Sequence, residues 1–89
     1  MMDREELMDI LADEECLTAD GFDSALVGCT YGANVVAVYD VDQMVAVLME
    51  EGLEWDEAVE FLEYNIFGAY VGEKTPQYVR FAKEEVHND

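Results

Sequence analysis

Apolar residues recur at helical spacing in three segments of the chain, and the first two are clearly bounded. From Asp3 to Glu14, leucine and isoleucine repeat every three or four residues, and Asp3 is placed to cap the helix. The second segment begins at Asp40 or Asp42 and ends at Gly52. Glycine suits the left-handed residue that follows a helix. Two amphipathic helices are therefore expected.

The third helix is expected to begin near Glu54 and to break near Gly68, because Gly68 and Gly72 weaken its continuation and Pro76 forbids it. Two extended segments, residues 25–31 and 35–39, precede the helical pair and are rich in β-branched and aromatic side chains. The intervening Gly32-Ala33-Asn34 predicts a hairpin with a three-residue loop. Because both strands are apolar on both faces, helices or a second copy of the chain are expected to cover both faces.

A short third strand is expected from Tyr78, Val79 and Phe81. The order helix, antiparallel β-hairpin, two-helix hairpin, short strand predicts an α+β fold with a small antiparallel sheet. With 89 residues, 52% of them hydrophobic, the chain predicts one domain over 1–89, with a frayed tail at 82–89. Cys16 and Cys29 are expected to be ordinary free thiols rather than a disulfide.

Charge changes this picture more than any motif does. The chain has 22 Asp and Glu against 4 Lys and Arg, a formal net charge of −18. From Glu5 to Glu73, eighteen carboxylates follow one another without a Lys or Arg among them. Such a chain is not expected to bind nucleic acid phosphates directly or to settle on an anionic membrane. The expected partners are basic proteins or cations.

Localisation follows from the N-terminus and from the longest uncharged run. Asp3, Glu5 and Glu6 do not form the basic region of a signal peptide. The uncharged run from Ser24 to Tyr39 is shorter than the ~18 apolar residues that a membrane span requires. The chain is therefore expected to be cytoplasmic, in the host cytoplasm if a phage encodes it.

Catalytic, metal and DNA-reading motifs are not found. The only His is His87, in the tail, so no His-based triad or multi-His zinc site is supported. Asp40, Asp42 and Glu51 have the spacing of calcium-loop ligands, but Val45 occupies the position that requires glycine. A DNA-reading second helix would also need basic or amide side chains at its start, where this chain has carboxylates. We expect no enzyme, cofactor or metal.

Carboxylates on the third helix are the candidate partner-binding site. Asp56, Glu60 and Glu63 recur at i, i+4 and i+7, so they lie on one side, about 4.5 to 6 Å apart along the axis. That interval resembles the repeat of charge along a nucleic-acid strand, ~3.4 Å of axis. The residues that extend this surface around the helix junction are Glu50, Glu51 and Glu54.

Aromatic residues after this helix have two interpretations. Tyr64, Phe67, Tyr70 and Tyr78 are expected to belong to the core. Alternatively, the last three, close to Gly68 and Gly72, form a surface for self-association into a homodimer, because tyrosine is favoured at interfaces.

Three segments resemble a small, largely uncharacterised family that is common in bacteriophage and prokaryotic genomes: DGFDSALVG at 20–28, VAVYD at 36–40 and EEGLEWDEAVEFLEYNIFGAYVGEKTP at 50–76. In the third segment Tyr64-Asn65, Gly68-Ala69-Tyr70, Gly72 and Thr75-Pro76 fit the pattern of that family, whereas Glu54 replaces its usual short cap. The resemblance implies a phage or mobile-element setting. It carries no activity and no functional residues.

Together these features favour a non-catalytic, phage-encoded nucleic-acid mimic. It is expected to block the basic binding surface of a host defence or nucleic-acid-handling protein, as an inhibitor of the anti-CRISPR or anti-restriction type. Two alternatives stay open: a homo-oligomeric structural or adaptor protein of phage origin, and an acid-adapted protein of a halophile.

Overall fold

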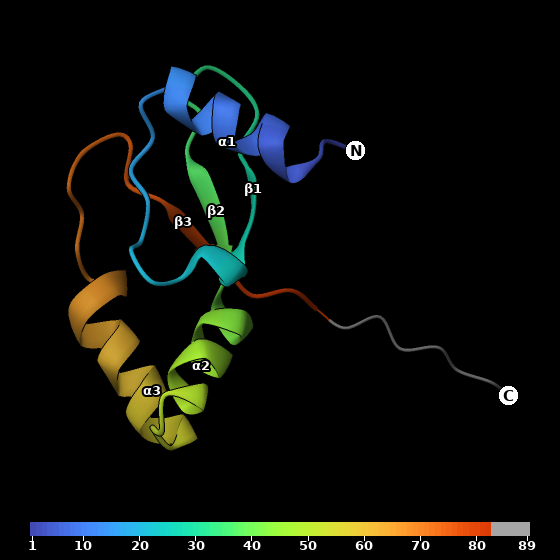
Figure 1. Ribbon diagram of the computed structural model, residues 1–89. Helices are drawn as coiled ribbons and strands as arrows, with labels where there is room; N and C mark the ends of the chain where they lie inside the picture. The colour runs from blue at the N-terminus through green and yellow to red at the C-terminus, as the bar shows by residue number, and fades with distance from the viewer. Residues whose placement is uncertain (83–89) are drawn as a thin grey trace, which may run out of the picture.

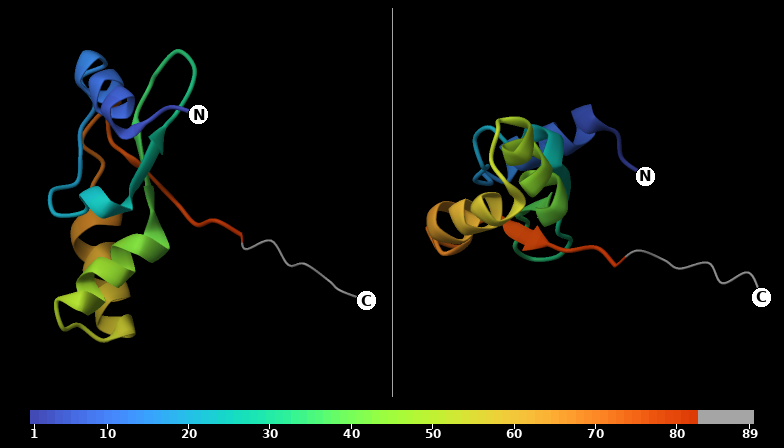
Figure 2. Two further views of the ribbon diagram at one scale, coloured as in Figure 1. Left: turned by 45° about the vertical axis from the view of Figure 1, so that its right-hand side comes forward. Right: turned by 90° about the horizontal axis from the view of Figure 1, so that it is seen from below.

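The structure is a computed structural model that describes residues 1–82. Three α-helices and a three-stranded sheet confirm the predicted α+β class. Helix α1 and the α2–α3 hairpin lie at opposite ends of the sheet (Figures 1 and 2). The elements are α1 (Arg4–Asp13), η1 (Asp23–Ala25), β1 (Leu26–Cys29), β2 (Ala37–Asp40), α2 (Val41–Glu50), α3 (Trp55–Leu62), η2 (Glu63–Phe67) and β3 (Gln77–Val79).

Aspartate side chains cap the first two helices, as the sequence predicts. The Asp3 carboxylate accepts a 2.8 Å hydrogen bond from the Glu6 amide, and Asp40 accepts one of 2.9 Å from the Asp42 amide. After α2 ends at Glu50, Gly52 adopts φ +109°, the left-handed conformation. The end of α2 is therefore fixed by local chemistry, because that conformation suits glycine.

Helix α1 ends in the same way, but without a glycine. Glu15 adopts φ 55°, and the Cys16 amide donates a 2.9 Å hydrogen bond to the Leu11 carbonyl. An L-residue with a Cβ is strained in this conformation by about 1–2 kcal/mol. Glu15 is thus a position where the closing turn outweighs the intrinsic preference of the residue.

The sheet differs from the predicted one in direction. Strand β2 is central, with β1 antiparallel on one side and β3 parallel on the other. The prediction of an antiparallel sheet is therefore wrong for β3, and the sheet is mixed. The reason is the connection. The α2–α3 hairpin returns the chain to the end of the sheet that it left, and residues 68–76 then carry it to the end where β2 begins, so β3 runs the same way as β2 (Figure 1).

The β1–β2 connection is also wider than the predicted three-residue loop. It spans residues 30–36, and its base is closed by Thr30, whose hydroxyl accepts a 2.9 Å hydrogen bond from the Val36 amide. The same hydroxyl donates 3.3 Å to the Asn34 carbonyl. The Thr30 amide also donates a 2.9 Å hydrogen bond to the Val36 carbonyl, so the hydroxyl replaces only the return bond of this last pair.

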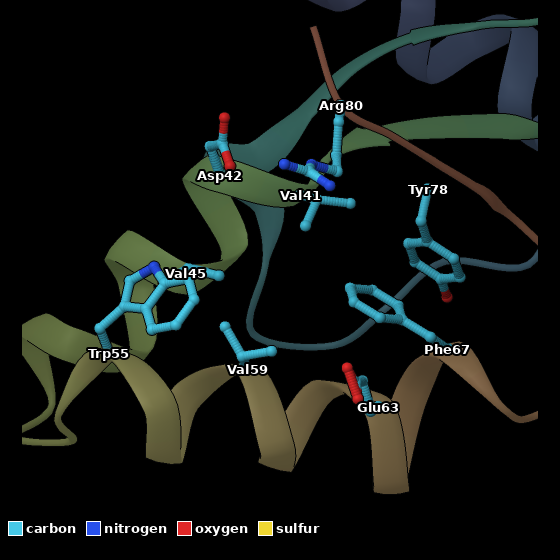
Figure 3. Close-up of a pocket in the computed structure, with 9 residues that line it drawn as sticks. All are labelled: Val41, Asp42, Val45, Trp55, Val59, Glu63, Phe67, Tyr78 and Arg80. Atoms are coloured by element: carbon cyan, nitrogen blue, oxygen red, sulfur yellow. The ribbon is translucent and has the colours of Figure 1, made fainter.

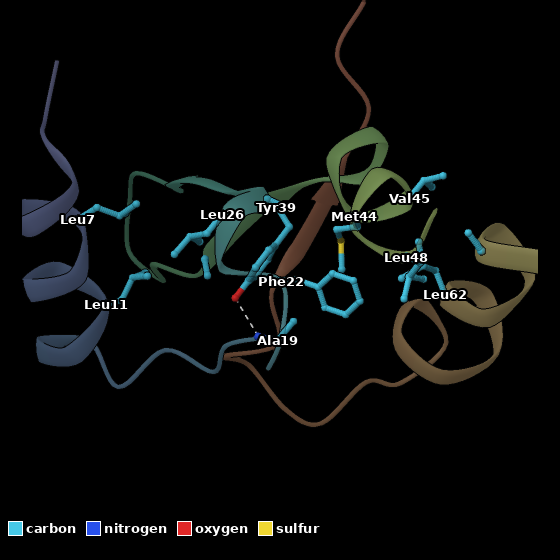
Figure 4. Packing of buried hydrophobic residues seen from close by; sticks show 13 residues of the cluster. Leu7, Leu11, Ala19, Phe22, Leu26, Tyr39, Met44, Val45, Leu48 and Leu62 are labelled. Carbon is cyan, nitrogen blue, oxygen red and sulfur yellow. Dashed lines mark hydrogen bonds between the residues drawn. The ribbon is translucent and has the colours of Figure 1, made fainter. Parts of the chain in front are cut away.

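The core runs from α1 through one face of the sheet into the α2–α3 hairpin (Figure 4). Its centre is Tyr39, which is fully buried and accepts a 2.8 Å hydrogen bond from the Ala19 amide at its hydroxyl oxygen. Burial raises the pKa of the Tyr39 hydroxyl. Helix α1 contributes Leu7 and Leu11, while Met44 and Leu62 close the hairpin end.

The opposite face of the sheet is less well covered. Val38 and Val79 are half-buried there, and the neighbouring Val27 is 48% exposed. Within residues 1–82, helices therefore do not supply the full cover expected for this face, and cover by a second copy of the chain stays a prediction. His87 and most of the tail predicted to fray lie outside the described residues.

Candidate functional site: an acidic hairpin and its groove

Most acidic side chains of the described residues lie at the two ends of the molecule. Seven lie between Asp3 and Glu15, on and around α1, and seven between Glu50 and Glu63, on the α2–α3 hairpin. All fourteen are exposed. The hairpin is therefore a strongly anionic surface, and the α1 end is a second one of equal number.

Two of the basic side chains, those of Arg4 and Lys74, contact the protein's own backbone. Both terminal nitrogens of Arg4 donate to backbone carbonyls, one to Leu26 at 2.6 Å and the other to Asp23. The Lys74 ammonium donates a hydrogen bond of 3.0 Å to the Val35 carbonyl and lies 3.6 Å from a Glu14 carboxylate oxygen. These two cations fasten the fold at the α1 end, so the hairpin carboxylates gain no compensation from them.

The structure places Asp56, Glu60 and Glu63 on one side of α3, as predicted, and we call these three residues the acidic stripe. All are exposed. Glu63 begins η2 but keeps α-helical dihedrals (φ −63°, ψ −40°), so the α-helical spacing holds up to it. Glu50, Glu51 and Glu54 are exposed at the hairpin turn that precedes α3.

A groove of about 550 Å³ opens beside the acidic stripe, between α2, α3 and β3 (Figure 3). Three charged residues, Asp42, Glu63 and Arg80, contribute to its lining. The other lining side chains are apolar or aromatic: Val41, Val45, Trp55, Val59, Phe67 and Tyr78. We call it the α2–α3 groove. Glu63 belongs to both features, so the groove and the stripe form one continuous surface.

A π turn shapes the end of the groove. In an α-helix each fourth residue lies about 40° further around the axis, so a line through Trp55, Val59 and Glu63 would drift away from α2. The wider turn of η2 brings Phe67 back to the groove, where the centroid of its ring lies 4.8 Å from that of Tyr78. The Asn65 side chain, in this turn, donates a hydrogen bond of 3.0 Å to the Phe61 carbonyl of α3.

The aromatic residues divide into two groups. Phe67 and Tyr78 are half-buried and pack against the core, as the core interpretation predicts. Burial raises the pKa of the Tyr78 hydroxyl. Tyr64 and Tyr70 are 84% and 76% exposed, so the core prediction is wrong for both. Of the three residues expected to mediate self-association, Tyr70 is exposed, whereas Phe67 and Tyr78 belong to the groove and its support.

The groove itself was not predicted from the sequence. Trp55, the first residue of α3, is 62% exposed and forms one wall of the groove. The available signal was the four-residue spacing of Trp55, Val59, Glu63 and Phe67. This spacing indicates a groove only once the π turn of η2 and the position of β3 beside β2 are known. Neither of these has a local sequence signature.

The two cysteines lie away from the groove and do not form a reactive pair. The thiols of Cys16 and Cys29 are free, and that of Cys16 donates a hydrogen bond of 3.1 Å to the Val35 carbonyl. Burial raises the Cys16 pKa, which disfavours a reactive thiolate. In this part of the chain, His, Cys, Asp and Glu form no group of three able to hold a metal ion, and no helix has the length and apolar character to cross a bilayer.

Comparison of the chain with protein-family models, with curated proteins and with solved structures found no match. The resemblance of residues 20–28, 36–40 and 50–76 to a phage-associated family therefore stays an expectation from the sequence.

Proposed function

We propose that this protein is a non-catalytic inhibitor that occupies the basic, nucleic-acid-binding surface of another protein, with the acidic stripe as its contact. The observation that carries the proposal is where the charged side chains lie. The Arg4 and Lys74 side chains donate hydrogen bonds to backbone carbonyls of the protein itself. The carboxylates of the acidic stripe, in contrast, are exposed on one side of the helix. An uncompensated row of carboxylates attracts cationic surfaces and steers their association.

The free-energy cost of placing like charges along one helix side supports a functional role for them. Like charges at i and i+4 destabilise a helix by a few tenths of a kcal/mol for each pair. A halophile's surface would carry the same cost for solubility alone. It would also require salt to remain folded, and a circular-dichroism salt series separates the two explanations. The phage setting and the anti-CRISPR or anti-restriction class of target belong to this proposal, as does action in the host cytoplasm.

A charge-reversal pair tests the proposal against net charge alone. Glu60→Lys with Glu63→Lys reverses two of the three charges of the acidic stripe, and Asp9→Lys with Asp13→Lys makes the same change in net charge on exposed residues of α1. Each protein is immobilised and incubated with nuclease-treated bacterial lysate, then eluted with duplex oligonucleotide. The proposal expects the native chain and the α1 variant to retain nucleic-acid-binding proteins that the oligonucleotide releases. Equal capture by the stripe variant would remove the proposal.

The homo-oligomeric alternative makes a separate prediction. Tyr70 and Tyr64 are exposed, and a dimer formed through them would be detected by light scattering at high protein concentration. The net charge of −18 opposes such association at low salt. A monomer under these conditions counts against the alternative.

A further inference from the structure

The α2–α3 groove exposes apolar surface that the fold does not use. Trp55 is 62% exposed, although Val45, on the facing helix, is buried. Trp55 and Val59 lie on α3, while Phe67 and Tyr78 close the far end. A concave surface lined mostly by apolar and aromatic side chains, with a few charged groups at its margin, is typical of a binding site.

The charges around the groove select its occupant. Asp42 and Glu63 outnumber Arg80 in the lining, and the acidic stripe continues outward from Glu63. Figure 3 shows Arg80 beside Asp42, on the wall opposite Glu63 and Val59. A cationic group that enters along α3 therefore meets carboxylates first. An anionic occupant, or a second copy of this chain at −18, meets repulsion instead.

We propose that the α2–α3 groove binds an apolar side chain, aromatic or long aliphatic, carried on a lysine- or arginine-rich segment of the partner protein. This inference rests on the proposed function and deepens it, because one partner segment contacts both the acidic stripe and the groove. Proteins that bind single-stranded nucleic acid combine cations with aromatic side chains that stack on bases. The stripe and the groove present the complementary pair, anions beside flat aromatic walls.

The sole tryptophan of the chain is the reporter for this proposal. Trp55 lines the groove, so an apolar occupant that displaces water from its ring shifts its emission to shorter wavelength. The probe is a blocked decapeptide with three lysines on each side of Leu-Phe-Phe-Leu, and the control peptide has four alanines at the centre. We expect the first peptide to shift the emission and to bind at least about tenfold more tightly than the control.

The peptide outcomes separate the two proposals. Equal, salt-sensitive binding of both peptides without an emission shift overturns the groove proposal and leaves the acidic stripe intact. Binding of neither peptide overturns the groove proposal and also removes support from the proposed function. An emission shift that follows protein concentration without peptide shows that a second copy is the occupant, which overturns the proposal as well.

Two variants of α3 distinguish the groove from simple attraction of charges. Val59→Asp places a carboxylate in the groove, and Phe61→Asp adds the same charge at a residue that lines a different hollow, beside Glu57 and Tyr64. Electrostatics alone predicts tighter binding of the lysine-rich peptide to both. The groove proposal predicts about tenfold weaker binding to Val59→Asp only. Should that variant fail to unfold cooperatively, Val59→Ala provides the same comparison with a smaller loss, and unchanged affinity there overturns the proposal.

Discussion

The Lys74 ammonium lies 3.6 Å from a Glu14 carboxylate oxygen, and this is the one ion pair within the described residues 1–82 of this strongly acidic chain. The same ammonium donates 3.0 Å to the Val35 carbonyl. Residue 74 also accepts a hydrogen bond from the Leu17 amide through its carbonyl, and the neighbouring Glu73 carbonyl accepts one from Asn34. One lysine thus joins the loop before β3 to the end of α1 and to the β1–β2 connection.

Replacing Lys74 therefore costs more than an exposed ion pair would. Lys74→Met keeps much of the apolar stem and removes the charged donor. It should lower the free energy of unfolding by about 1–2 kcal/mol, because the Val35 carbonyl loses a charge-assisted hydrogen bond. Glu14→Gln is the control and should cost less than about 1 kcal/mol, since that side chain is well exposed. Urea titration measures both, and equal losses would show that the carbonyl contact contributes nothing.

Tyr39 supports the buried backbone through a single atom. In Tyr39→Phe the Ala19 amide, 2.8 Å from the hydroxyl oxygen, loses its acceptor in a buried position. We expect a loss of about 1–3 kcal/mol in the free energy of unfolding. Tyr31→Phe, at a fully exposed residue, should be neutral. Thermal or urea denaturation measures both variants. Equal free energies of unfolding for the two would contradict the role given to the Tyr39 hydroxyl.

The raised pKa of Tyr39 also predicts the alkaline limit of stability. Burial holds the folded pKa above the ordinary value of 10.0, so above about pH 10 the unfolded chain releases this proton first. The stability contributed by the buried hydroxyl is complete below pH 10 and is lost as the pH rises through the folded pKa. Unfolding free energies between about pH 9 and pH 11 should therefore fall more steeply for the native chain than for Tyr39→Phe. Parallel curves would refute this.

Glu15 offers a stabilising substitution. At φ 55°, Glu15→Gly should raise the free energy of unfolding by about 1 kcal/mol, because glycine adopts this conformation without the Cβ clash. Glu15→Ala removes the same charge but keeps the Cβ, so it separates relief of strain from relief of repulsion. The glycine variant should be the more stable of the two. If alanine stabilises as much as glycine, charge rather than backbone conformation is the cause.

Arg80 should weaken the binding of cationic segments to the α2–α3 groove. Its guanidinium lies in the lining with Asp42, so Arg80→Gln removes a like charge from the path of a lysine-rich peptide. The affinity for the Leu-Phe-Phe-Leu decapeptide should increase several-fold at low salt, and the difference should shrink as salt rises. Peptide titration followed through Trp55 emission measures this, and weaker binding would mean that Arg80 itself contacts the peptide.

Local chemistry accounts for the part of the fold that was predictable. The caps Asp3 and Asp40, the terminating Gly52 and the apolar stripe of α2 each act within one or two helical turns. Their positions can therefore be read from neighbouring residues. The direction of β3 depends instead on residues 68–76, which carry the chain past the sheet before β3 begins, and no residue near Tyr78 encodes that path.

The candidate site was predictable to the same degree. Helical spacing places Asp56, Glu60 and Glu63 together, but the groove beside them requires the π turn of η2 and the return of β3. Aromatic residues were harder still, since Tyr70 and Phe67 lie three apart and differ in burial. The seven carboxylates around α1 also show that charge alone does not identify the contact surface.

The most direct measurement of the central claim is displacement of nucleic acid. A fluorescein-labelled DNA duplex is first bound to a nucleic-acid-binding protein that the native chain has captured from lysate. The native chain or a variant is then titrated in, and the anisotropy of the labelled duplex is followed. The account predicts that the native chain and Asp9→Lys/Asp13→Lys release the duplex, whereas Glu60→Lys/Glu63→Lys does not. A duplex that stays bound while the native chain also binds would contradict the account.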